Sequence, residues 1–119
     1  MKVHDIVTQI IAALKGELHD GFGTVKMFAE EQSERLARFA LVVAEERAFG
    51  SLKTNNTMFK RFTKRLEEQT EAIARHLVML SVLTLEKAWN AIVGVVWGAI
   101  NSILANTGLP IEMPDVPSV

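Results

Sequence analysis

The chain has 119 residues, 49% of them hydrophobic, and its 13 Lys and Arg residues nearly balance 14 Asp and Glu residues, giving a formal net charge of -1. This length fits one small domain, and the near-neutral charge gives no general reason to expect a nucleic-acid partner. The sequence contains no cysteine, which excludes disulfides, thiolate metal ligands and a cysteine nucleophile. Strand-like alternation is scarce, so we predict an all-α protein.

The first predicted helix spans residues 3–15. Its apolar side chains recur at helical spacing and form one stripe, made of Val3, Ile6, Val7, Ile10, Ile11 and Leu14. Gly16 begins a predicted break that continues through Gly23. Polar residues interrupt this N-terminal segment and it lacks a small-residue cleavage site, so we expect no secretory signal.

Two further helices are predicted, over residues 24–48 and 57–105. Thr24 is the expected N-cap of the first, and Asn56 or Thr57 that of the second. As a continuous helix, 57–105 would extend about 73 Å. Its heptad-like apolar spacing is typical of a coiled coil, a membrane span or a helical assembly.

A kink within residues 81–87 is the alternative to one continuous helix. Gly108 and Pro110 end the helical part, so residues 1–108 are predicted to form one helical domain. Residues 109–119 form an extended tail that contains the three prolines. We expect this tail to dock on a neighbouring subunit.

Charge patterning indicates how the second and third helices meet. If they fold back as an antiparallel hairpin about the 50–56 turn, five pairs of opposite charge face each other: Glu46 and Lys60, Glu45 and Arg61, Arg38 and Glu68, Arg35 and Glu71, and Glu31 and Arg75. Each exposed pair contributes only about 0–1 kcal/mol, so such pairs would select the register more than stabilise the fold. The predicted architecture is this hairpin with a short N-terminal helix and a long C-terminal helix, assembled as a coiled-coil or bundle-like oligomer.

The stretch 88–105 carries no charge and holds nine large apolar side chains. A helix without a charged face must contact other helices or lipid. We expect that one chain offers too little surface to cover both sides of it, so self-association is predicted. The expected contact residues in the homo-oligomer are Trp89, Ile92, Gly94, Val96, Gly98, Ile100, Asn101 and Ile103.

A membrane setting is the main alternative. Gly94 and Gly98 form a GxxxG pattern, which permits close helix approach in lipid and equally in a water-soluble bundle. The 18 residues of 88–105 would span about 27 Å as a helix, close to the roughly 30 Å hydrocarbon core of a bilayer. The alternative function is therefore a small membrane protein with one C-terminal span, or a helical protein that inserts into membranes.

Four basic residues interleave with Phe59 and Phe62 and form a candidate contact for an anionic partner: Lys60, Arg61, Lys64 and Arg65. Phosphate on lipid or nucleic acid would suit such a cluster. The competing interpretation is a solvated helix face partly paired with Glu45 and Glu46. No nucleic-acid-binding motif accompanies the cluster, so a nucleic-acid partner is not expected.

Catalytic and metal-binding patterns are missing from the sequence. The three histidines lack ligand spacing, and Glu30, Glu31 and Glu34 have no ExxH companion of the di-iron type. We therefore predict no enzyme activity, metal or cofactor. The predicted function is a non-enzymatic structural or scaffolding subunit that assembles with copies of itself, and with other subunits of a larger assembly. A phage or other virion component, or an intracellular protein, is the expected setting, with the membrane as the alternative.

Overall fold

The computed structural model describes residues 2–118. Within them the chain forms four α-helices and one 3-10 helix: α1 (Val3–Leu18), η1 (His19–Thr24), α2 (Lys26–Phe49), α3 (Asn56–Leu80) and α4 (Leu85–Leu104). This part of the chain contains no strand. The prediction of an all-α protein is confirmed.

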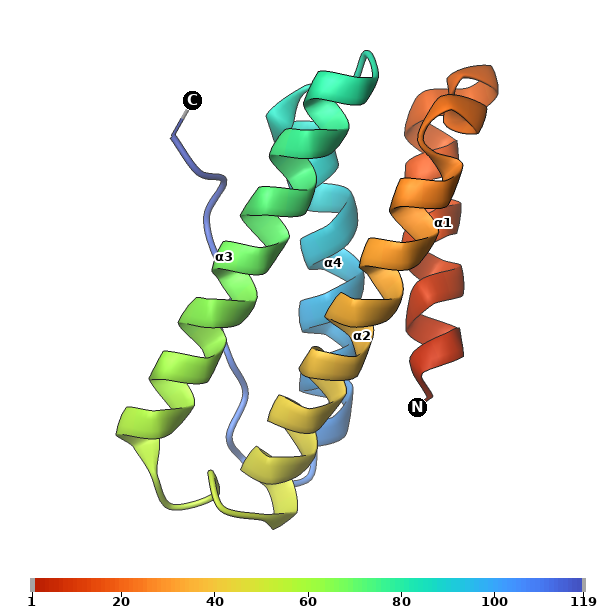
Figure 1. Cartoon of the computed structure of the whole chain (residues 1–119). Coiled ribbons are helices and arrows are strands. Elements are labelled where there is room, and N and C mark those ends of the chain that lie inside the picture. Colours follow the sequence, from red (N-terminus) through yellow and green to blue (C-terminus); the bar gives the residue numbers. More distant parts are fainter. Residues whose placement is uncertain (1, 119) are drawn as a thin grey trace.

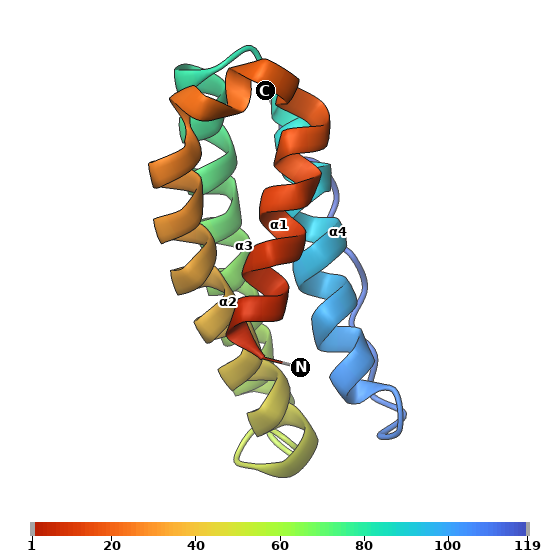
Figure 2. The same ribbon diagram turned by 90° about the vertical axis from the view of Figure 1, so that its right-hand side faces the viewer.

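The four helices run alternately up and down (Figure 1). Helices α2 and α4 contact each other, and α1 and α3 each pack against both of them. The two views place α1 and α3 on opposite sides of the α2–α4 pair (Figures 1 and 2). The bundle measures 44 × 29 × 19 Å, so each helix borders a shared core rather than forming a separate rod.

The predicted single helix over 57–105 is wrong, because the chain turns back between α3 and α4. The Ser81 hydroxyl donates to the Leu77 carbonyl at 2.6 Å and accepts from the Leu83 amide at 3.2 Å. Thr84 then caps α4 by accepting from the Lys87 amide at 3.2 Å. Two hydroxyl residues thus satisfy backbone groups at both helix ends, and α4 lies beside α3 instead of extending it.

Other helix ends differ from the prediction by a few residues. Helix α1 continues through Gly16 to Leu18, because the Leu18 side chain is buried. The residue that precedes α2 is Val25 rather than Thr24. The N-cap of α3 is Asn55, whose side chain accepts from the Met58 amide at 3.0 Å, rather than Asn56 or Thr57.

Helices α2 and α3 run antiparallel about the 50–55 turn, but the five predicted charge pairs do not form among residues 2–118. Arg38 pairs with Glu34 at 2.6 Å and Arg75 with Glu71 at 3.0 Å, each along its own helix. An i,i+4 partner is always within reach on a helix surface, whereas a cross-helix partner must span the groove between two helices. Aromatic contact marks the seam instead, since the rings of Phe39 and Phe62 lie 6.1 Å apart.

Candidate functional site

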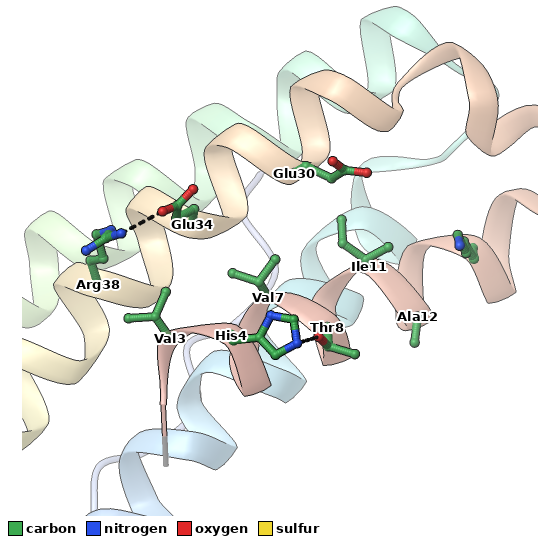
Figure 3. Close-up of a pocket in the computed structure, with 10 residues that line it drawn as sticks. Val3, His4, Val7, Thr8, Ile11, Ala12, Glu30, Glu34 and Arg38 are labelled. Carbon is green, nitrogen blue, oxygen red and sulfur yellow. Dashed lines mark hydrogen bonds and ion pairs between the residues drawn. The ribbon is translucent and has the colours of Figure 1, made fainter.

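A groove of about 750 Å³ lies on the surface between α1 and α2 (Figure 3). Val3, Val7 and Ile11 project from α1 toward α2 and form its apolar floor. They are half-buried, whereas Ile6, Ile10 and Leu14 on the adjacent row of α1 are fully buried. The apolar stripe predicted from the sequence therefore has two rows, and only one of them is covered by the core.

The rim of this groove is polar. Glu30, Glu34 and Arg38 lie along the α2 side, with the Arg38–Glu34 ion pair exposed to solvent. On the α1 side the His4 ring lies 3.5 Å from the Thr8 hydroxyl. At the far end the Lys15 ammonium group lies 5.4 Å from the centre of the Phe22 ring. An apolar floor with charges of both signs around it is suited to bind an amphipathic partner surface.

Four of the predicted oligomer-contact residues lie in the core of their own chain. Trp89, Ile92, Val96 and Ile100 each expose 2% or less of their surface. Of the nine large apolar side chains in this stretch, seven are buried and two, Val95 and Ile103, are half-buried. The expectation that one chain cannot cover both sides of the stretch is therefore wrong. Helices α1, α2 and α3 all pack on α4, which the single long helix could not have allowed.

The glycines of the predicted contact lie on the outer face of α4. Gly94 is exposed and Gly98 is half-buried. A Cβ atom added at either position would meet no heavy atom within 4 Å. Within residues 2–118, the GxxxG pattern thus marks open surface on α4 rather than close approach of two helices.

Asn101, a predicted oligomer-contact residue, forms hydrogen bonds with the tail of its own chain. Its side-chain amide donates to the Ile111 carbonyl at 3.0 Å and accepts from the Ile111 amide at 2.8 Å. The Trp89 indole donates to the Pro114 carbonyl at 3.3 Å, and the Arg75 guanidinium donates to the Ser118 carbonyl at 2.7 Å. These bonds hold the extended tail along α3 and α4, so the tail covers part of the body to which it belongs.

The predicted anionic-partner residues share one exposed surface. Lys60, Arg61, Lys64 and Arg65 are all exposed on the first half of α3. The predicted pairing with Glu45 and Glu46 is not found within residues 2–118. Glu46 accepts from the Ser51 amide at 2.8 Å and from the Ser51 hydroxyl at 2.9 Å. These two bonds lower the pKa of Glu46 and engage its carboxylate in the 50–55 turn.

Neither a metal site nor a membrane span is found among residues 2–118. No three His, Asp or Glu side chains in this range come together as metal ligands. The His76 ring contacts the Phe28 ring at a tilt of 47°, with ring centres 4.2 Å apart. His76 is exposed, so it lies at the edge of the α2–α3 seam. No described helix combines the length and the apolar character needed to cross a bilayer.

No protein-family model, curated protein or solved structure matches this chain.

Proposed function

We propose that this chain is a non-enzymatic structural subunit that self-associates through the face formed by α1 and α2. The observation that carries the proposal is the groove between these helices, with its half-buried floor of Val3, Val7 and Ile11. We place the self-association contact on this face because the contact residues predicted on α4 are largely buried within their own chain. Association through a partly apolar groove removes these three side chains from water at little cost in polar groups.

The outer face of α2 extends this surface and is self-complementary. It exposes 77% of Met27 and 56% of Val42 on either side of a charged centre. Suppose a second copy of α2 crosses antiparallel, centred between Glu34 and Arg35. Glu34 then faces the partner's Arg35, Glu31 faces the partner's Arg38, and Met27 faces the partner's Val42.

The size of the face is adequate for a dimer. Helix α2 has 24 residues and is therefore about 36 Å long. A specific interface needs roughly 1,000 Å² of buried surface in total. The face available for such a contact runs the length of α2 and is widened by the α1–α2 groove. A two-fold arrangement also closes on itself, so it gives a defined dimer instead of an open fibre.

Sedimentation velocity at micromolar concentration tests the proposal. We expect a dimer for the natural chain and a folded monomer for Val7→Glu, because the added carboxylate lies in the groove. Gln9→Glu is the matched control, since it adds the same charge to an exposed position on α1 that does not line this groove. A natural chain that stays monomeric, or a control that dissociates as fully as Val7→Glu, contradicts the proposal.

A charge swap tests the register. Arg38→Glu is expected to weaken the dimer by placing two carboxylates opposite each other, and Glu31→Arg in the same chain is expected to restore it. Failure of the second substitution to restore the dimer contradicts the antiparallel register. Membership of a virion, and assembly with other subunits, stay predictions.

A further inference from the structure

The end of the bundle around the 50–55 turn is strongly basic. Residues 39–66 carry six of the 13 Lys and Arg residues but only two of the 14 acidic residues, so the rest of the chain is acidic. Five of these six cations are exposed and form what we call the basic end: Lys53, Lys60, Arg61, Lys64 and Arg65. This end of the bundle thus carries a net positive charge.

Among residues 2–118, these cations have no acidic side chain at ion-pair distance. None of the ion pairs formed among residues 2–118 involves a residue of the basic end. Of the nearby carboxylates, Glu46 is bonded to Ser51. Four others line a second pocket together with Lys64 but form no ion pair with it: Glu67, Glu68, Glu71 and Asp115. The charge of Lys64 nevertheless acts on Glu67, whose pKa it lowers against the larger effect of burial. Unpaired charges of one sign create a field that attracts a partner of the opposite sign.

The helical positions of the four α3 cations distribute the charge over a convex surface. At 100° per residue, Lys60, Lys64, Arg61 and Arg65 cover about 140° of the helix circumference. The 50–55 turn that joins α3 to α2 forms the lower tip of the bundle (Figure 1). A rounded basic tip can lie against an extended anionic surface, whereas a duplex groove is better matched by a narrow stripe or an inserted helix.

An exposed aromatic ring accompanies the charge. Phe49 is the last residue of α2 and exposes 80% of its surface, and Met58 in the first turn of α3 exposes 38%. The neighbouring Phe59 is buried under Arg47, whose guanidinium carbon lies 4.3 Å from the centre of the Phe59 ring. The turn itself is held in place because Arg47 donates to the Leu52 carbonyl at 2.8 Å. Phe49 is therefore an exposed aromatic side chain at the end of α2, next in the chain to the turn that leads to the α3 cations.

We propose that the basic end docks on an anionic lipid surface, with the Phe49 ring inserted among the headgroups. Cations near such a surface and a partly inserted aromatic ring are the two contributions that together give a stable but reversible attachment. This attachment needs no membrane-spanning helix. It is independent of the proposed dimer, although a dimer would present two basic ends.

Vesicle sedimentation tests the proposal with the full chain. We expect binding to vesicles that contain phosphatidylserine, little binding to pure phosphatidylcholine vesicles, and weaker binding as salt is raised. The double variant Lys60→Gln and Lys64→Gln is expected to lower the partition coefficient about 25-fold, or fivefold for each cation. The matched control removes the same charge from the opposite end with Lys26→Gln and Lys87→Gln, and binding should change less than about twofold.

A second variant reports insertion directly. The emission that Phe49→Trp adds to that of Trp89 and Trp97, taken as the difference from the natural chain, is expected to shift to the blue on phosphatidylserine vesicles. Phe49→Ser is expected to reduce binding about tenfold without changing the salt dependence. Circular dichroism checks that each variant is folded. The proposal is overturned if the chain binds neither kind of vesicle, or if the Lys26 and Lys87 control loses as much binding as the basic-end variant. It is also overturned if the chain binds short duplex DNA or RNA but not vesicles.

Discussion

Helix α4 and the α1–α2 face both carry apolar side chains, but those of α4 are mostly buried and those of the α1–α2 face stay partly exposed. Helix α4 has no charge between Ala88 and Leu104, and nearly all of its large side chains are buried against three helices. The α1–α2 face mixes apolar and charged residues, and its apolar row stays half-open to solvent.

This difference shows that the more apolar segment need not be the association surface. A strongly apolar helix has the most to gain from burial, so the first partners to cover it are the other helices of the same chain. The apolar surface that stays partly open to solvent is then the one with intermediate apolar character.

The largest effect is expected in the core of α4. Trp97 exposes only 1% of its surface, so Trp97→Ala should lower the free energy of unfolding by about 3–5 kcal/mol. Val7→Ala in the half-open groove should cost only about 1 kcal/mol or less. Urea unfolding of the two variants measures both values, and equal losses would remove the distinction between a covered α4 and an open groove.

A smaller effect is expected where the tail meets α4. Asn101→Ala removes both hydrogen bonds to the Ile111 backbone and should lower stability by about 1–2 kcal/mol. Amide hydrogen exchange at Ile111 should accelerate in this variant. Asn90→Ala, at an exposed position of the same helix, is the control and should leave that exchange rate unchanged. An unaltered rate at Ile111 in Asn101→Ala would mean that the tail is held by other contacts.

Replacing the glycines of α4 is expected to raise the stability of the chain rather than lower it. Gly94→Ala and Gly98→Ala should each raise stability by about 0.5–1 kcal/mol, because a Cβ atom meets open space and alanine favours the helix. Thermal unfolding measures the gain. If either variant instead loses stability or changes the mass of the assembly, α4 makes a close contact at its outer face after all.

The smallest effects are expected in the pH dependence of two carboxylates. Burial raises the pKa of Glu67, so the stability it contributes is full below the unfolded-state pKa and lost as pH rises through the folded value. Glu67→Gln should therefore stabilise the chain slightly at neutral pH and have no effect in acid, and the gain stays small because solvent screens this partly exposed carboxylate. The Ser51 hydrogen bonds lower the pKa of Glu46, so its contribution is present above the unfolded-state pKa and lost as pH falls. Urea unfolding curves at several pH values measure how the stability contributed by each carboxylate changes with pH. As pH rises, the contribution of Glu67 should fall and that of Glu46 should grow. If both contributions changed in the same direction, burial of Glu67 and hydrogen bonding of Glu46 would not be the causes of their pKa shifts.

Helical periodicity was sufficient to predict the all-α class and the approximate extent of the first two helices. Periodicity failed at the α3–α4 turn, because the apolar spacing continues through residues 81–84 although α3 ends at Leu80 and α4 begins at Leu85. The signal was local: Ser81 and Thr84 each offer a hydroxyl to backbone groups that a helix end leaves unpaired. Burial of Leu83 and Leu85 beside them then fixes the reversal.

The candidate sites were predictable to different degrees. The basic residues of α3 could be found because Lys and Arg cluster in the sequence and such side chains are almost always exposed. The α4 contact was assigned to another copy because periodicity reveals which side chains need cover but not which helices provide it. The α1–α2 groove was missed for a related reason. Val7 and Ile10 are equally apolar in the sequence, and only the packing of α2 and α4 leaves one half-open and buries the other.

Tryptophan exposure in the dissociated monomer tests the central claim most directly. Trp89 and Trp97 are the two tryptophans of the chain and no tyrosine is present, so its fluorescence reports on α4. For Val7→Glu as a monomer, we expect blue-shifted emission and weak acrylamide quenching, because the covering helices belong to the same chain. Red-shifted emission and strong quenching in a folded monomer would show that α4 depends on a second copy for its cover.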